Sequence, residues 1–212
     1  MVAKKEFIEC INNNIPKNTY HCFIVPNLKK TFNNYYTNAL DFEHNFYIVE
    51  EYIDVLLNNN CFEILEKEYF IDHSIIYITK KVENINTEIK TFPNLYEQNK
   101  ITAMNFYNYH NDLILKLNKQ IEFFNGDLYL FGGTGFSIYL IKFGLNTSKI
   151  KNILDNDPNK EGKIVYGTTF IVKNPEIIKS SENVAVIVKA ASYQKEIEEQ
   201  LYKLNKKVII LT

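Results

Sequence analysis

The stretch Leu128-Tyr129-Leu130-Phe131-Gly132-Gly133-Thr134-Gly135-Phe136 decides the fold of the second half of this 212-residue chain. An apolar run leads into a cluster of glycines, and a helix is predicted to follow over residues 136–143. A strand, a glycine turn and a helix in this order expose backbone N–H groups at a helix N-terminus, which stabilises an anion such as phosphate. A tight strand-to-helix turn that binds no ligand needs the same glycines, so both interpretations stay open.

The rest of the second half alternates strands and helices around this turn. The sequence predicts a helix at residues 196–204 and further strands at 150–154, 168–172, 184–188 and 208–211. This alternation is typical of a parallel sheet covered by helices on both faces. We therefore expect an α/β fold in which the second half is a Rossmann-like three-layer domain.

An acid follows the second strand of this predicted domain. Asp155 lies at about the twenty-residue offset at which a carboxylate contacts a ribose in nucleotide-binding folds. The predicted cofactor-binding residues are accordingly Gly132, Gly133, Gly135 and Asp155. Ile138 stands where a full G-x-G-x-x-G motif has its third glycine, which counts against a nicotinamide-dependent dehydrogenase.

The first half has fewer strands and a weaker pattern. A helix is predicted at residues 4–13 and an amphipathic helix at 49–58. Two β-rich runs at 62–70 and 74–81 are separated by three residues, a spacing typical of an antiparallel hairpin. The strand at 20–25 has apolar residues at consecutive positions, which predicts a buried strand of the parallel type.

A polar stretch without periodicity at residues 82–93 separates the two halves. We therefore predict a partial α/β region at residues 1–88, which ends in the antiparallel hairpin, and the Rossmann-like domain at 89–212. The second domain is expected to open with a long helix from about residue 95 to 124, because apolar residues recur there at helical spacing.

Composition restricts the class of protein. The net charge is −1 with acids and bases balanced, so nucleic acid is not expected as a partner. No apolar run reaches membrane-spanning length and no signal peptide is recognisable, so we expect a soluble cytoplasmic protein without a membrane partner. The three cysteines are scattered without metal-ligand spacing, which indicates free thiols and no metal site.

Three side chains of the first half could carry acid–base chemistry. Glu43 and His44 are adjacent, and a carboxylate that accepts a hydrogen bond from an imidazole raises its basicity near neutral pH. The alternative is that both residues lie in a solvated loop. His73 follows the first run of the predicted hairpin, where it could point into a cleft or face water in the turn.

A family resemblance connects these features. Its specific part consists of Phe131 to Gly135, the run from Ile153 to Lys163, Tyr166-Gly167-Thr168 and Pro175-Glu176. These residues resemble the C-terminal domain of the sugar C-methyltransferases, which use S-adenosylmethionine. A looser part consists of Ile24 to Leu28, Glu43-His44 with Tyr47, and Cys61 to Ile64, which resemble the end of the donor-binding domain of that family.

The resemblance implies a catalytic set and a cofactor. Glu43 or His44 would be the base at the acceptor sugar, with Tyr47 and His73 nearby, and S-adenosylmethionine would be the methyl donor. The chain departs from the family where Asp41 and Phe42 replace the first Tyr and His of its motif. It also has no cysteine-rich zinc module and no glycine turn ahead of Tyr20, so donor binding would need residues outside this chain.

Two hypotheses follow for function. The first is a methyltransferase, or its acceptor-binding and C-terminal part, that acts on a nucleotide sugar or a similar small molecule. The alternative is a non-catalytic nucleotide- or nucleotide-sugar-binding module that has lost the donor site. A dehydrogenase or epimerase would depend on the glycine turn alone. In each case the strand near Cys22 is expected to have an open edge, covered by a second polypeptide, a second copy of the chain or a missing N-terminal region.

Overall fold

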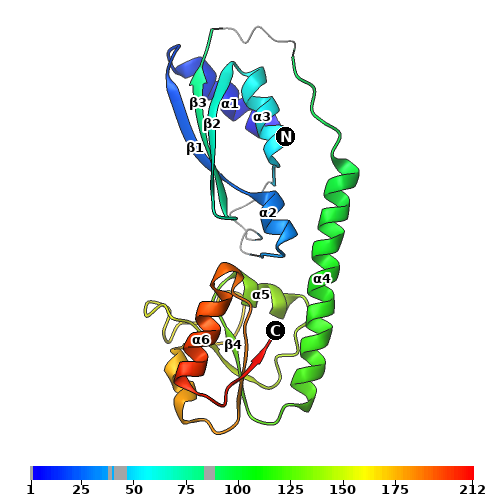
Figure 1. The fold of residues 1–212 in the computed structure, drawn as a ribbon, viewed down its shortest axis with the longest axis vertical. Coiled ribbons are helices and arrows are strands. Elements are labelled where there is room, and N and C mark those ends of the chain that lie inside the picture. Colours follow the sequence, from blue (N-terminus) through cyan, green and yellow to red (C-terminus); the bar gives the residue numbers. More distant parts are fainter. Residues whose placement is uncertain (1, 38–39, 41–46, 84–88) are drawn as a thin grey trace. The chain divides into compact units, whose positions relative to one another are not determined.

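The computed structural model describes residues 2–37, 40, 47–83 and 89–212 (Figure 1). The chain forms two compact units. Unit 1 consists of residues 1–33 and 42–102, and unit 2 consists of residues 34–41 and 103–212. The expected boundary at residues 88 and 89 lies ahead of the long helix α4 (Tyr96–Phe123), whereas the packing divides within that helix.

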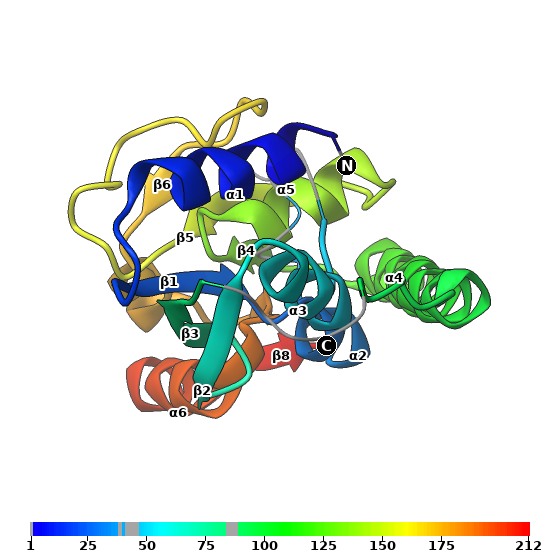
Figure 2. The same cartoon turned by 90° about the horizontal axis from the view of Figure 1, so that it is seen from above.

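Unit 1 contains a three-stranded antiparallel sheet. Its elements are α1 (Val2–Asn14), β1 (Tyr20–Pro26), α2 (Leu28–Asn33), α3 (Glu50–Asn59), β2 (Phe62–Phe70) and β3 (Ser74–Lys81). The strands lie in the order β1-β3-β2, and β3 runs antiparallel to both neighbours (Figures 1 and 2). The hairpin predicted from the two β-rich runs is confirmed, with the expected bounds for both strands.

One face of this sheet carries the core of unit 1. Phe62 and Tyr77 are fully buried there, beside Ile75. Ile53 and Leu57 of α3 pack against them, and α1 adds Ile8, Ile11 and Ile15. The apolar side chains of both helices therefore cover the same face of the sheet.

The prediction of a buried, parallel-type strand near Cys22 is wrong. β1 pairs antiparallel with β3, from Tyr20 opposite Lys80 to Pro26 opposite Ser74. Its side chains alternate between partly buried and exposed, and Tyr20, Cys22 and Ile24 point away from the core. The apolar residues at consecutive positions suggested two covered faces, but the helices of unit 1 cover only one of them. In the described part of unit 1, β1 is an edge strand, as expected.

Unit 2 is a Rossmann-like α/β fold. Its five-stranded sheet has the order β6-β5-β4-β7-β8 and is parallel throughout. The strands are β4 (Asp127–Phe131), β5 (Ile150–Leu154), β6 (Val172–Lys173), β7 (Val184–Ile187) and β8 (Ile209–Leu211). The connecting helices are α5 (Gly135–Lys142), η1 (Pro175–Ser180), η2 (Ala191–Tyr193) and α6 (Gln194–Leu204).

Two apolar layers enclose this sheet. Leu128 and Leu130 of the central strand β4 face a cluster that includes Leu117 and Ile121 of α4 and Leu140 of α5. Tyr129 and Phe131 face the opposite cluster, which includes Ile178 of η1 and Leu201 of α6. Figure 1 shows α4 and α6 on opposite sides of β4. The predicted three-layer arrangement is confirmed.

One predicted strand of unit 2 is misplaced. We expected a strand at residues 168–172, but β6 covers only Val172–Lys173. The hydroxyl of Thr168 donates to the carbonyl of Val165 and accepts from the N–H of Phe170, which closes a local turn. Local side-chain hydrogen bonds of this kind compete with strand pairing, so the β-branched residues at 168 and 169 lie ahead of the strand.

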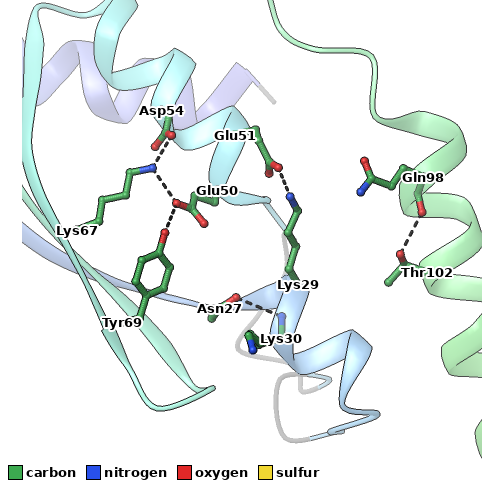
Figure 3. Close-up of polar contacts among 10 residues, drawn as sticks. All are labelled: Asn27, Lys29, Lys30, Glu50, Glu51, Asp54, Lys67, Tyr69, Gln98 and Thr102. Atoms are coloured by element: carbon green, nitrogen blue, oxygen red, sulfur yellow. Dashed lines mark hydrogen bonds and ion pairs between the residues drawn. The ribbon is translucent and has the colours of Figure 1, made fainter.

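A polar network joins α3 to the sheet of unit 1 (Figure 3). The ammonium of Lys67 donates to Glu50 Oε1 at 2.8 Å and to Asp54 Oδ2 at 2.5 Å. The hydroxyl groups of Tyr69 and Tyr77 donate to the same two carboxylates, at 2.6 and 3.0 Å. Burial by itself raises the pKa of Glu50, but the hydrogen bonds from Lys67 and Tyr69 outweigh it and the net pKa is lowered.

We expect Lys67→Met to destabilise unit 1 by about 1–3 kcal/mol, because two partly buried carboxylates lose their shared cation. Amide hydrogen exchange of β2 and β3 in the full chain would report the change. Lys17→Met is the control, because the pair of Lys17 with Glu83 is exposed and such pairs contribute little. Equal loss of protection in both variants would contradict the importance of the network.

Candidate functional site

The candidate site lies at the carboxyl edge of the unit 2 sheet. The chain leaves the central strand β4 through α5 to β5 on one side, and it returns to β7 on the other side. The strand order therefore reverses between β4 and β7. Ligands of open parallel sheets bind outside the carboxyl ends of the strands at such a switch point.

The glycine turn follows β4 at this point. Gly132 has a φ of +97°, a left-handed conformation that favours glycine, and its N–H donates to the carbonyl of Leu154 at 2.6 Å. A Cβ on Gly133 would lie 3.3 Å from both Asp155 Oδ2 and Val172 Cγ2. Glycine is thus favoured at the two positions for different reasons. Gly132 adopts the left-handed conformation of the turn, and Gly133 leaves room for the side chains of Asp155 and Val172.

Asp155 binds the glycine turn directly. Its Oδ2 accepts from the N–H of Gly133 at 2.7 Å and from the ammonium of Lys160 at 2.9 Å, and its Oδ1 accepts from the N–H of Asp157 at 2.9 Å. Burial raises the pKa of this carboxyl group, but these hydrogen bonds outweigh the effect and the net pKa is lowered. Asp155 is therefore a carboxylate at neutral pH and connects β5 to the turn.

The N-terminus of α5 receives no side-chain cap. Thr134 has the extended N-cap conformation, but its side chain makes no capping hydrogen bond. The buried Ser137 hydroxyl does not cap the first N–H groups of α5 either, because it donates to the carbonyls of Gly132 and Phe131. The first N–H groups of a helix have no partner within the helix, so among the residues that the structure describes they remain open to an anion at this end of α5.

The main chain of Thr37 lies next to the same helix end. The carbonyl oxygen of Thr37 would be 3.8 Å from a Cβ on Gly135. Thr37 is only 3% exposed, and its Oγ1 has no hydrogen-bond partner among the residues that the structure describes. The main chain of Thr37 thus lies beside the N-terminus of α5, and its buried hydroxyl lacks a partner among the described residues, which costs free energy.

Lys189 supplies a cation at the switch point. Leu130 of β4 pairs with Ile187 of β7, so Gly132 and Lys189 leave the sheet at neighbouring points. The ammonium of Lys189 donates to the hydroxyl of Tyr109 at 2.6 Å. The ring of Tyr109 in turn stacks on Tyr35, with centroids 4.0 Å apart and planes inclined by 10°.

His110 lies behind this cluster. It is 1% exposed, and its Nδ1 is 2.9 Å from the carbonyl of Phe106. Burial lowers its pKa and the charge of Lys189 lowers it further, against the opposing effect of the Phe106 and Tyr35 carbonyls. The ring is therefore neutral at pH 7, with its proton on Nδ1. Nε2 has no hydrogen-bond partner in the described part of the chain.

The residues predicted for catalysis belong to unit 1 or lie outside the described residues. Glu43 and His44 fall in the second group. Tyr47 is 42% exposed, and its ring meets the edge of Phe32. His73 lies in the turn between β2 and β3, where its Nδ1 is 2.5 Å from the hydroxyl of Ser74. The predicted cofactor-binding residues Gly132, Gly133, Gly135 and Asp155 do come together at the carboxyl edge of unit 2.

Sequence reasoning missed several members of the cluster at the switch point, among them Lys189, Tyr109 and Thr37. Lys189 had a usable signal, because it directly follows a buried strand of a predicted parallel sheet. Tyr109 had none, since 80 residues separate it from Lys189. Within the described residues, no group of three or more His, Cys, Asp or Glu side chains could hold a metal ion, and no helix could cross a membrane.

Unit 1 does not fit the methyl donor that the family resemblance implies. All seven glycines of the chain lie between residues 126 and 167, so unit 1 contains none. A glycine turn that brings the backbone close to a nucleotide is therefore missing there. In unit 2 the N–H of Gly133 already donates to Asp155.

We expect Asp155→Asn to destabilise unit 2 by about 1–3 kcal/mol at neutral pH, because a buried charge-assisted contact is lost. The folded-state pKa of Asp155 lies below its ordinary value of 3.8, so this stabilisation is complete above that value and disappears as the pH falls through the lowered pKa. The unmodified chain and Asp155→Asn should therefore be compared by thermal unfolding from neutral pH downward. The difference between their melting temperatures should shrink in acid. Asp157→Asn is the control, and an equal effect there would contradict the assignment.

Comparison of the chain with protein-family models and with curated proteins found no match.

Proposed function

We propose that this chain binds a nucleotide sugar at the carboxyl edge of the unit 2 sheet and is the acceptor-binding part of a S-adenosylmethionine-dependent methyltransferase. The observation that supports the proposal most is the uncapped N-terminus of α5 at a switch point, with Lys189 leaving the sheet beside it. A helix N-terminus and a lysine both favour a phosphate group. A nucleotide sugar carries two phosphates that could use both.

The aromatic pair extends the same argument. Tyr35 and Tyr109 are stacked and only partly buried, and the Tyr109 hydroxyl holds the ammonium of Lys189. The face of an aromatic ring suits a base or a sugar ring. A ligand with its phosphates at Lys189 would thus have an aromatic surface within reach for one of its rings.

Methyl transfer requires a methyl donor. Unit 1 contains no glycine turn that could bind this donor. In our proposal a second polypeptide supplies S-adenosylmethionine. The family resemblance implies that Glu43 or His44 is the base, and that Tyr47 and His73 are further members of the catalytic set. Residues of this chain are not proposed to bind the methyl donor.

The second candidate function is a nucleotide-sugar-binding or docking module without methyl transfer. The absence of glycine from unit 1 favours this candidate, because unit 1 then lacks the glycine turn that a donor site of the family would need. Both candidates share the ligand site of unit 2. They differ in whether Glu43 and His44 have a catalytic role.

Calorimetry with UDP-glucose and dTDP-glucose tests the shared site. We expect Lys189→Met to weaken binding about ten- to hundredfold, since a hydrogen bond from a charged donor contributes roughly 1.5–3 kcal/mol. Lys203→Met is the matched control, because Lys203 is exposed and lies in the last turn of α6, at the far end of that helix from Lys189. Absence of binding to either nucleotide sugar, or equal affinity of the two variants, would refute the site.

A mixture of the chain with the product of the neighbouring gene tests the catalytic assignment. If that mixture transfers a methyl group from S-adenosylmethionine, we expect Glu43→Gln or His44→Asn to lower the rate about 100-fold, the usual effect of removing a general base. Binding of UDP-glucose should be unchanged in both variants. Full activity of both variants would exclude Glu43 and His44, and nucleotide-sugar binding without donor binding in any mixture would favour the module.

A further inference from the structure

The two edges of the unit 1 sheet differ in how they are protected. The β2 edge has a register shift between Ile64 and Glu66, and its charged side chains include Glu63, Glu66 and Glu68. Bulges and charges of this kind prevent a sheet edge from pairing with another strand. β1 has an unbroken seven-residue ladder with β3 and no charged residue, so its edge has neither protection.

The backbone groups at the β1 edge can be assigned from the ladder. Asn27 donates its N–H to the carbonyl of His73, and the carbonyl of Thr19 accepts from the N–H of Lys81. Hydrogen bonding alternates along an antiparallel strand, so the odd-numbered residues of β1 pair with β3. The N–H and C=O groups of Tyr20, Cys22 and Ile24 therefore point toward the open edge.

The same residues carry the exposed side chains of β1. Tyr20 is 67% exposed, Ile24 is 65% exposed, and Cys22 between them is also exposed. A two-fold axis at Cys22 would place Tyr20 of one copy opposite Ile24 of the other and would bring the two Cys22 residues face to face. Aromatic and β-branched side chains form favourable cross-strand pairs, so the most exposed apolar groups of β1 would cover each other.

Strand direction favours the same arrangement. β2, β3 and β1 alternate in direction across the sheet. Antiparallel pairing of β1 with β1 of a second copy continues this alternation through six strands. The contact is isologous, the commonest symmetry of soluble dimers, and places no like charges opposite each other because β1 has none.

We propose that two copies of this chain pair through their β1 strands, with the axis at Cys22, to form a continuous six-stranded antiparallel sheet. The inference does not depend on the proposed function, because it uses only residues of unit 1. It commits to a second copy of the chain as the occupant of the open edge.

Sedimentation velocity of the full chain over a range of concentrations tests this arrangement. We expect the unmodified chain to be a dimer and Ile24→Lys to weaken its association about tenfold or more, because a favourable pair is lost on each side of the axis. Leu65→Lys on β2 is the matched control, since Leu65 is also an exposed apolar residue of the sheet. It should leave the dimer intact.

Oxidation with diamide, which accepts the two electrons and two protons of a thiol pair, tests the register. Opposite residues of a hydrogen-bonded antiparallel pair have Cα atoms about 5.5 Å apart, within disulfide range. Cys10→Ser should therefore still give a disulfide-linked dimer through Cys22, and adding Cys22→Ser to this variant should abolish the cross-link. A monomer at every concentration, a dimer insensitive to Ile24→Lys, or a cross-link in Cys10→Ser that persists when Cys22→Ser is added would each overturn the proposal.

Discussion

The hydrogen bond from the Gly133 N–H to Asp155 is the contact on which the architecture of unit 2 depends. It joins the turn after β4 to the end of β5, and Lys160 compensates the charge of the carboxylate from the loop that leads to β6. Three consecutive segments of the sheet are thereby fixed at one point. A Cβ at position 133 would lie 3.3 Å from both Asp155 Oδ2 and Val172 Cγ2, so a larger residue there requires both neighbours to shift.

How much the sequence predicted depended on whether a feature is local. The bounds of β2 and β3 followed from local alternation, and Gly132 and Asp155 were found because the turn and the following acid are close in sequence. The carboxylate of Asp155 accepts from the protein's own Gly133 N–H and from Lys160, contacts that an offset along the chain cannot reveal. β1 was misjudged because apolar residues at consecutive positions do not tell how many faces of a sheet are covered.

The two units divide the chemistry unevenly. All seven glycines of the chain lie in unit 2, and a Cβ at Gly126 or Gly133 would lie closer to its neighbours than ordinary van der Waals contact. Unit 1 instead has a charged network on α3 and β2 that fixes one face of its sheet, while the opposite face and the β1 edge remain exposed. Ligand recognition and association with other chains are thus supported by different halves of the molecule.

The inclusion of residues 34–41 in unit 2 has a consequence for how the chain is synthesised and dissected. Tyr35 and Thr37 leave the ribosome long before Tyr109 and Gly135, so the site cannot assemble until the C-terminal sheet exists. A recombinant fragment that starts at the long helix would contain the whole parallel sheet and still lack one ring of the aromatic stack. A domain border at residues 88 and 89 would therefore separate the two rings of this stack, so gene fusions or truncations should keep Tyr35 in the same polypeptide.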